Sequence, residues 1–321
     1  MVKVFIIAEA GINHNGKIKL AKQLIDIASK AKVDAVKFQL FDTDNFIHKK
    51  KLFKIYKIFK KLEFSKNTWK IIINYAKKKK IKLFFSVFDI PSVNLLSKLN
   101  IKLVKIPSGE INNIELLKTI NRKKFKVILS TGMAKMSEIK FSLKILKNCN
   151  VSILHCVSAY PAEISKLNLN FIKKLRKIFN FRIGFSDHTN EINASSIAVS
   201  QGAQIIEKHF TYKKNQKFGD HKMSLSPKEL IEFVKNIRNT EKMMGKEKKL
   251  IYKNELNLSK VARKGVYIRQ NINKGEILKK ENIILLRPEN QKNLISYKKS
   301  IGKKAKKNIK SLDNFNNKNF K

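Results

Sequence analysis

Two lysines of this 321-residue chain stand inside otherwise apolar runs, Lys37 in AVKFQL and Lys105 in LVKIP. An ammonium group that is buried without a partner costs free energy, and a bound anion would remove that cost. Ser108 and Ser130 follow such runs, and the backbone amides near Gly109 and Gly132 can approach an anion. These residues predict a site for a ligand that carries both a phosphate and a carboxylate.

Buried carboxylates offer a second explanation for the two lysines. Glu9 ends the first apolar run of the chain, and Glu110 follows the run that contains Lys105. Each lysine could pair with one of these glutamates instead of with a ligand. The sequence alone leaves both explanations open.

His188 and His209 each end an apolar run, and the two runs are consecutive in the chain. Neutral imidazoles at the ends of neighbouring strands can share one divalent cation. Asp220, in the turn Gly219-Asp220-His221, would add a carboxylate for the metal or for a substrate hydroxyl. Structural hydrogen bonding by each histidine, and a solvated turn around Asp220, are the alternatives.

The elements that must position these residues alternate between short β-branched runs and longer segments of helical periodicity, eight times in succession. The expected strands are 3–8, 35–40, 83–87, 103–106, 127–130, 152–156, 182–185 and 204–208, and the expected helices include 20–31, 68–79, 138–147, 169–178 and 227–244. Eight such units in about 245 residues predict an α/β fold, a (β/α)₈ TIM barrel. A doubly wound sheet is the alternative, but no GxGxxG follows the first strand.

In such a barrel the active site lies at the carboxyl ends of the strands, and every expected strand ends in hydrogen-bonding or titratable residues. This convergence on one mouth predicts an enzyme. From about Tyr252 the pattern changes to short strands and turns. We therefore expect a barrel domain over 1–245, a polar linker over 246–258 and a small β-rich domain over 259–321, with the last residues frayed.

The chain carries 70 Lys and Arg against 24 Asp and Glu, a formal net charge of +46. Charge of this size is typical of polyanion-binding proteins, and a basic, non-catalytic protein of that class is one alternative function. The lysines, however, run evenly from end to end, so we interpret them as solvated surface and expect neither nucleic acid nor membrane as partner. The two cysteines lack CxxC spacing, the start lacks a signal-like apolar run, and no run approaches the ~18 apolar residues of a membrane span, so we expect a cytoplasmic protein.

Eight motifs, AEAGINHNG, VKFQ, KIPSGE, LSTGM, HCVSAYP, GFSDHT, EKHFT and GDHKMSLSP, occur in this order. Together they closely resemble the sialic acid synthase family over nearly the whole chain, and the C-terminal module resembles the antifreeze-like (SAF) domain of the same enzymes. The resemblance implies condensation of phosphoenolpyruvate with an N-acetylated mannosamine-type sugar aldehyde, which gives a nine-carbon 2-keto-3-deoxy sugar acid and phosphate. It also implies a domain-swapped homodimer in which the SAF domain reaches over the partner's barrel. A phosphoenolpyruvate-dependent synthase of eight-carbon or aromatic precursors is the enzymatic rival, but those enzymes lack the appended module.

The resemblance also implies a role for each candidate residue. Phosphoenolpyruvate would be held by Lys37, Ser86, Lys105, Ser108 and Ser130, and the sugar by Glu9, Gln39, Tyr160, Asp220 and Arg287 of the partner subunit. His188 and His209 would hold Mn²⁺ or Mg²⁺, which would polarise the sugar aldehyde. Glu110 is the candidate for proton transfer near C2, so the expected catalytic residues are Glu9, Glu110, His188 and His209.

The chain departs from the family pattern at positions that concern the acceptor sugar. Members specific for N-acetylmannosamine tend to carry Asn where Ser158 stands in HCVSAYP. A diacetamido-trideoxy hexose, which would give legionaminate or pseudaminate, is therefore the alternative acceptor. The usual Arg-Pro-Gly of the SAF domain reads Arg287-Pro288-Glu289.

Overall fold

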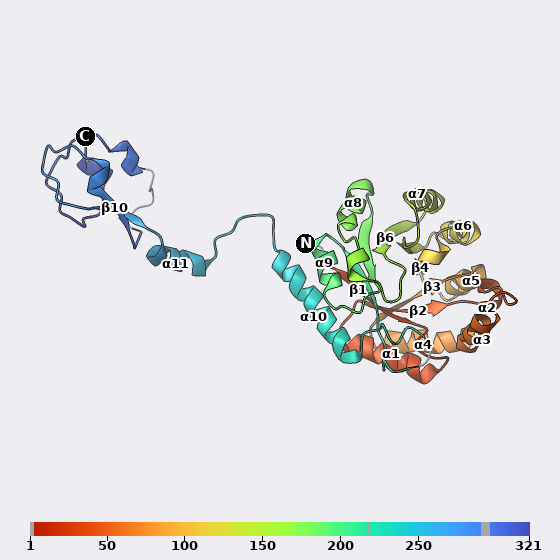
Figure 1. Ribbon diagram of the computed structural model, residues 1–321. Coiled ribbons are helices and arrows are strands. Elements are labelled where there is room, and N and C mark those ends of the chain that lie inside the picture. The colour runs from red at the N-terminus through yellow and green to blue at the C-terminus, as the bar shows by residue number, and fades with distance from the viewer. Residues whose placement is uncertain (1–2, 217–218, 290–295) are drawn as a thin grey trace. The chain divides into compact units, whose positions relative to one another are not determined.

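The computed structural model describes residues 3–216, 219–289 and 296–321, and it divides into two compact units, residues 1–246 and 247–321. The first unit is a closed barrel of eight parallel strands in sequential order, each followed by at least one helix on the outside (Figure 1). The predicted (β/α)₈ TIM barrel is therefore confirmed.

The barrel strands are β1 (Phe5–Gly11), β2 (Ala35–Leu40), β3 (Lys82–Val87), β4 (Leu103–Ile106), β5 (Lys126–Ser130), β6 (Asn150–Cys156), β7 (Arg182–Asp187) and β8 (Ile205–His209). The helices around them are α1 (Ile18–Lys30), α2 (Thr43–Phe46), α3 (Phe53–Leu62), α4 (Lys66–Lys78), α5 (Ile90–Lys98), α6 (Ile114–Arg122), α7 (Met136–Ile145), α8 (Phe171–Ile178), α9 (Ala194–Ser200) and α10 (Pro227–Met244).

The sequence pattern placed β2, β4 and α10 at their observed bounds, but β1, β7 and β8 continue further toward their carboxyl ends than predicted. The apolar run in the sequence ends where the inward-facing residues become polar, whereas the hydrogen bonding between neighbouring strands continues beyond that point. Glu9 of β1 pairs in register with Lys37 of β2 and with His209 of β8. Polar residues expected just beyond these strands therefore lie within them.

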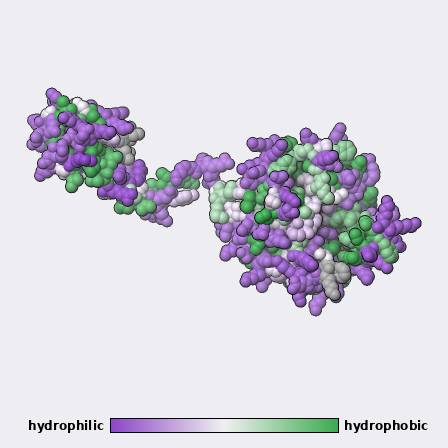
Figure 2. Space-filling view, in the orientation of Figure 1, coloured by the Kyte–Doolittle hydropathy of each residue, from purple (hydrophilic) through white to green (hydrophobic). Residues whose placement is uncertain are grey.

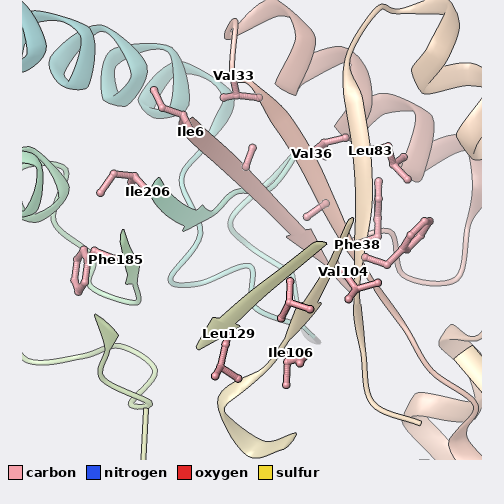
Figure 3. Packing of buried hydrophobic residues seen from close by; sticks show 14 of the residues in the cluster. Ile6, Val33, Val36, Phe38, Leu83, Val104, Ile106, Leu129, Phe185 and Ile206 are labelled. Atoms are coloured by element: carbon pink, nitrogen blue, oxygen red, sulfur yellow. The ribbon is translucent and has the colours of Figure 1, made fainter. Parts of the chain in front are cut away.

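Strand residues alternate between two apolar environments. Side chains on the outer face, such as Ile6, Val36, Phe38 and Ile206, pack under the surrounding helices (Figure 3). Side chains on the inner face near the amino ends of the strands form a second cluster, made of Ile7, Ala35, Phe84, Ile128, Leu154 and Ile205. This cluster, which we call the apolar floor, fills the barrel interior near the amino ends of the strands. The next inward-facing residue of each strand that contributes to it therefore lies directly above apolar side chains.

Local signals fix where several helices begin. The hydroxyl of Ser65 accepts a hydrogen bond from the Thr68 amide at the start of α4, and Ser226 forms a capping box with Glu229 ahead of Pro227 at the start of α10. α4 then presents Trp69 to the barrel. The Trp69 ring lies 4.9 Å from that of Phe85 and 5.1 Å from that of Phe64, centroid to centroid.

The second unit contains α11 (Lys253–Ala262) and the antiparallel pair β9 (Gly265–Ile268) and β10 (Ile283–Leu286). Its core includes Val266, Ile272 and Leu278, together with Phe315 and Phe320 from the end of the chain. The expectation that the last residues fray is wrong, because Phe315 and Phe320 are buried and their rings stack at 5.6 Å. Two aromatic side chains in a polar segment were enough to anchor it.

Hydrophilic residues cover much of the visible surface of both units, as the even spread of lysine predicts (Figure 2). Within the described ranges, no helix is long and apolar enough to cross a membrane. Cys149 and Cys156 are free thiols.

Replacing Trp69 by Ala should destabilise the barrel by about 3–5 kcal/mol, because the ring is 2% exposed and its removal leaves a cavity between α4 and the barrel wall. Urea denaturation followed by circular dichroism measures this loss, since Trp69 is the one tryptophan of the sequence and its fluorescence disappears with it. Phe141→Ala on α7 is the control. Its side chain is 51% exposed, so the free energy of unfolding should change by no more than about 0.5 kcal/mol. Equal losses in the two variants would contradict the packing described for Trp69.

Candidate active site

A cavity opens at the carboxyl ends of the barrel strands, with about 550 Å³ of space that includes its mouth. Ten of the residues predicted from the sequence line it: Glu9, Lys37, Gln39, Ser86, Lys105, Ser108, Ser130, Tyr160, His188 and His209. They come from six strands and from the loops after β4 and β6, and from just beyond β7. The alternation along the strands aims them at one point above the apolar floor.

Four charged side chains form the base of this cavity. Lys37 Nζ lies 2.5 Å from Glu9 Oε2 and 3.6 Å from Glu207 Oε2, and Lys105 Nζ lies 2.6 Å from Glu207 Oε1. All four residues are at most 3% exposed. Both lysines therefore pair with buried glutamates, the second of the two explanations that the sequence left open, although Lys105 pairs with Glu207 and not with Glu110.

Two hydroxyl groups add hydrogen bonds to this four-residue cluster, which we call the Lys–Glu cluster. Lys37 Nζ donates to Ser86 Oγ at 2.6 Å, and Ser186 Oγ donates to Glu207 Oε1 at 2.8 Å. Two ammonium and two carboxylate groups leave the cluster neutral when all are ionised. Any anion that binds here must therefore displace a carboxylate or arrive with a proton.

The pKa values of the cluster show which of its two glutamates is the first to take up a proton as the pH falls. Burial raises the pKa of Glu9 more than Lys37 lowers it, and the nearby charge of Glu207 raises it further. Burial also opposes the ionised form of Glu207, but Lys105 and Lys37 together outweigh it and hold the pKa of Glu207 well below its ordinary value. Glu207 is thus the permanent anion of the cluster, and Glu9 is the carboxyl that can take up a proton.

Glu207 and Ser186 line the cavity; both were among the polar residues expected at the strand ends, but neither was assigned a role in binding or catalysis. Glu207 stands two residues before His209 in β8, and Ser186 two residues before His188 at the end of β7. Because inward positions of a strand recur every second residue, both share the inner face with a histidine that was selected. The alternation was the signal that could have found them.

The two histidines lie side by side at the mouth, with ring centroids 5.8 Å apart. His188 Nδ1 donates to the Val157 carbonyl at 2.8 Å, so the lone pair of the neutral ring is on Nε2. Ser186 Oγ lies 3.3 Å from that Nε2, but its hydrogen is donated to Glu207. Burial lowers the pKa of His188 to about 4 and that of His209 to about 3, so both rings are neutral at pH 7.

Asp220 approaches the histidines from the loop after β8, and its Oδ2 lies 3.4 Å from His209 Nδ1. The Asn13 side chain holds this loop by accepting from the Asp220 amide at 3.0 Å. Gly11, which has a φ of +51°, passes beneath the carboxylate. A Cβ at Gly11 would lie 3.4 Å from both Asp220 Oδ2 and Glu9 Oε1, so the two carboxylates face the same place. Burial raises the pKa of Asp220 in spite of the neighbouring His188.

A small polar niche adjoins the lysine side of the cavity. Ser108 Oγ lies 3.1 Å from Cys156 Sγ and accepts a hydrogen bond from the Gly132 amide at 3.0 Å. A Cβ at Gly132 would collide with Ser158 Oγ, so the glycine after Ser130 and Thr131 is needed for close approach. Both predicted serines line the cavity, Ser108 from the 3₁₀ turn after β4 and Ser130 from the end of β5.

Two predicted residues lie elsewhere. Glu110 belongs to the 3₁₀ turn Ser108–Glu110 but does not line the cavity, and its carboxylate accepts from Asn113 Nδ2 at 2.7 Å. Burial raises its pKa, and the nearby Asp89 contributes. Arg287 lies just after β10 in the second unit, where its side chain is exposed. Its predicted role and that of Glu110 stay predictions.

A second ion pair, outside the barrel wall, holds the strand ends that carry the histidines. Asp187 and Lys208 are in register on β7 and β8, and Lys208 Nζ lies 2.9 Å from Asp187 Oδ1. Lys208 Nζ also donates to the carbonyls of Thr189 and Glu191, at 2.6 Å and 3.0 Å. Ser195 Oγ of α9 donates to the other Asp187 oxygen at 2.8 Å. The loop that follows His188 is thereby tied to the strand that ends in His209.

Lys208→Met should therefore destabilise the protein by about 3–5 kcal/mol, because the buried Asp187 carboxylate would lose its ion-pair partner. Lys118→Met is the matched control, since Lys118 pairs with Glu115 at a similar 2.8 Å but both side chains are more than half exposed. That change should cost no more than about 1 kcal/mol. Denaturant unfolding of both variants measures the difference. If Lys208→Met lowers the free energy of unfolding as little as the control does, the Lys208–Asp187 ion pair does not stabilise the ends of β7 and β8.

Whether the site fits a divalent cation depends on its free lone pairs. His188 Nε2 receives no hydrogen, and the buried His209 Nδ1 has no hydrogen-bond partner among the described residues. Across the same residues, no three His, Cys, Asp or Glu side chains converge closely enough to enclose a metal. The residues therefore fit a cation held by two imidazoles, with its remaining positions left to water and substrate.

Comparison with known proteins identifies relatives over nearly the whole chain. Residues 24–249 match the model of the NeuB family, and residues 263–313 match the SAF domain. The chain is 41% identical to N,N'-diacetyllegionaminic acid synthase of Campylobacter jejuni, over 97% of this chain and 98% of the relative. It is 36% identical to the enzyme of the same name from Legionella pneumophila, over 88% and 85% of the two chains.

A solved structure gives the same result. N-acetylneuraminic acid (sialic acid) synthetase from Leptospira borgpetersenii, in complex with citrate, superposes with a TM-score of 0.74 at 36% identity, over 80% of this chain and 90% of the other. The family model spans more than half of the chain, and the two Campylobacter and Legionella relatives are named as synthases. The chain is therefore an enzyme of the NeuB family that carries a C-terminal SAF domain.

Proposed function

We propose that the enzyme condenses phosphoenolpyruvate with an N-acetylated mannosamine-type sugar aldehyde, to give a nine-carbon 2-keto-3-deoxy sugar acid and phosphate. One observation carries the proposal above the others. A single cavity holds two buried lysines, one carboxyl with a raised pKa and two neutral histidines with free lone pairs. The condensation needs an anion site, a proton donor and a group that activates a carbonyl, and these residues can supply all three.

Phosphoenolpyruvate would occupy the lysine side of the cavity. Lys37 and Lys105 would hold its phosphate and carboxylate, with Ser86, Ser108 and Ser130 as hydrogen-bond donors. Binding would take the place of the ion pair between Lys37 and Glu9. While the site is empty, the ion pairs with Glu9 and Glu207 keep both lysines charged and positioned. The apolar floor beneath them excludes water and strengthens the attraction between the lysines and the ligand.

The sugar would occupy the histidine side. Its hydroxyl and amide groups would be bound by Glu9, Gln39, Tyr160 and Asp220. In the predicted dimer, Arg287 of the partner subunit would contribute as well. Mn²⁺ or Mg²⁺ on His188 and His209 would supply Lewis acidity at the aldehyde oxygen. The Tyr160 ring covers this side, with its centroid 4.3 Å from that of His188.

The residues of the cavity can account for the proton transfers. C3 of the enol attacks the aldehyde carbon to form the new C–C bond, and the protonated Glu9 gives its proton to the aldehyde oxygen. Water adds to C2 and returns a proton to Glu9. The adduct then collapses to the ketone, the bond between C2 and the phosphate oxygen breaks, and the C2 hydroxyl proton leaves with phosphate. Glu110 is the other predicted proton carrier near C2.

Among acceptors we favour 2,4-diacetamido-2,4,6-trideoxymannose. Two relatives at 41% and 36% identity are named N,N'-diacetyllegionaminic acid synthase, and Ser158 stands at the edge of the cavity niche where N-acetylmannosamine-specific members tend to have Asn. N-acetylmannosamine itself is the second candidate, because the Leptospira structure is of a sialic acid synthetase. A cytoplasmic location is part of the same proposal, since phosphoenolpyruvate is made there.

Phosphate release from phosphoenolpyruvate with Mn²⁺ should depend on the added sugar, and His209→Ala should reduce it at least about 100-fold, because one of the two imidazole ligands is lost. The assay compares 2,4-diacetamido-2,4,6-trideoxymannose, the corresponding altrose, N-acetylmannosamine and no sugar. His48→Ala is the matched control, since His48 is exposed on the segment between α2 and α3 and should leave the rate unchanged. Release without any sugar, or release that His209→Ala leaves intact, would refute the proposal.

Phosphoenolpyruvate binding should be accompanied by proton uptake at Glu9. The bound anion replaces Glu9 beside Lys37 and raises a pKa that burial has already raised, so affinity should fall as pH rises, by at most about tenfold per pH unit. Titration calorimetry in buffers of different ionisation enthalpy counts the protons. The ligand's own titration is common to the wild type and Glu9→Gln, so the difference between them isolates Glu9. Equal proton uptake in both proteins would exclude this role.

A further inference from the structure

One side of the cavity is built of three phenylalanines, which we call the phenylalanine wall. Phe46 ends α2, Phe59 lies on α3 and Phe88 follows β3, and all three line the cavity. Their ring centroids are 4.7 Å apart for Phe46 and Phe88 and 5.6 Å apart for Phe46 and Phe59. The rings thus form one continuous apolar surface over β2 and β3.

The wall has a buried apolar backing. Phe41, Ile12 and Leu62 are buried behind it, and the Phe41 ring lies 5.1 Å from that of Phe59. The three rings of the wall are themselves only partly buried, so each keeps a free surface. That free surface is available to whatever fills the cavity.

The segment that carries the wall is fixed on its outer side. Asp44 of α2 accepts hydrogen bonds from Tyr56 and Lys60 of α3, and Lys60 also pairs with Glu63 at 3.0 Å. These links join α2 to α3 across the intervening residues. The position of Phe46 relative to Phe59 is therefore set before any ligand binds.

Apart from Pro107, all other residues that line the cavity are polar or charged or carry a polar group. A ligand that fills the cavity therefore needs polar groups toward the lysines and histidines and an apolar group toward β2 and β3. Three phenyl rings give no hydrogen bond to a hydroxyl, which would lose its water on entering. A methyl group there buries apolar surface instead.

We propose that the phenylalanine wall receives the C6 methyl group of the acceptor sugar and makes the enzyme selective for 6-deoxy over 6-hydroxy hexoses. The inference rests on the proposed condensation and specifies its acceptor. In that reaction C1 of the open-chain sugar is at the Glu9 and His209 side, over β1 and β8, and C6 is the far end of the chain. The wall residues follow β2 and β3, the strands next to β1 in the barrel, and they line the same cavity.

The test compares two acceptors that differ at C6 alone, 2,4-diacetamido-2,4,6-trideoxymannose and 2,4-diacetamido-2,4-dideoxymannose. Phosphate release gives kcat/KM for each. The wild type should prefer the 6-deoxy sugar by about 10- to 200-fold, the range that one apolar group supplies in an apolar pocket. Phe59→Ala should lower this ratio at least about fivefold, with the KM for phosphoenolpyruvate unchanged. Phe59→Tyr keeps the ring, adds a hydroxyl and should lower the ratio as well, which guards against a folding defect in the alanine variant.

Phe141→Ala is the matched control, because Phe141 is a half-exposed phenylalanine of α7 outside the cavity, and the ratio should stay at the wild-type value. A wild-type ratio near one, or a ratio that neither Phe59 variant changes, overturns the selectivity while leaving the condensation in place. Absence of phosphate release in the wild type with both of these sugars and with N-acetylmannosamine overturns the condensation and this inference together.

Discussion

The Lys–Glu cluster is the constraint on which the rest of the barrel depends. Two ammonium groups at the centre of a barrel are stable only if their charge is balanced at contact distance, and Glu9 and Glu207 do this from β1 and β8. Lys37 and Lys105 come from β2 and β4, so the balance requires the barrel to be closed. Closure brings the last strand beside the first, and without it Glu207 would not meet either lysine.

The apolar parts of the fold serve this cluster in two ways. The floor of Ile7, Phe84 and their neighbours removes water from below it, which makes every charge interaction above stronger. The outer layer under the helices fixes the strand register, and one residue of slip would turn each inward lysine or glutamate to the opposite face. The cost of burying four charged groups is met by that packing and by the hydroxyls of Ser86 and Ser186.

Much of the barrel could be predicted from its sequence, because the eightfold alternation is periodic and each strand carries its own local signal. Most of the polar residues that line the cavity could be selected by their position at a strand end. What could not be predicted is pairing between distant residues. Lys105 and Glu207 are 102 positions apart, and only the closed barrel decides that Glu207, and not Glu110, is the partner. The phenylalanine wall was missed for the same reason, since its rings come from separate elements and the sequence gives no sign that they meet.

The net charge of +46 and the site act over different distances. Surface lysines are solvated and screened beyond about 10 Å, so they can attract anionic substrates without distinguishing them. The Lys–Glu cluster is neutral as a whole and does not add to that attraction, but its groups are desolvated and fixed. Under the proposed binding of phosphoenolpyruvate, selection begins when the anion displaces Glu9 from Lys37. An enzyme with this arrangement can carry a large surface charge of almost any value, because the step that chooses the ligand takes place where that charge has little influence.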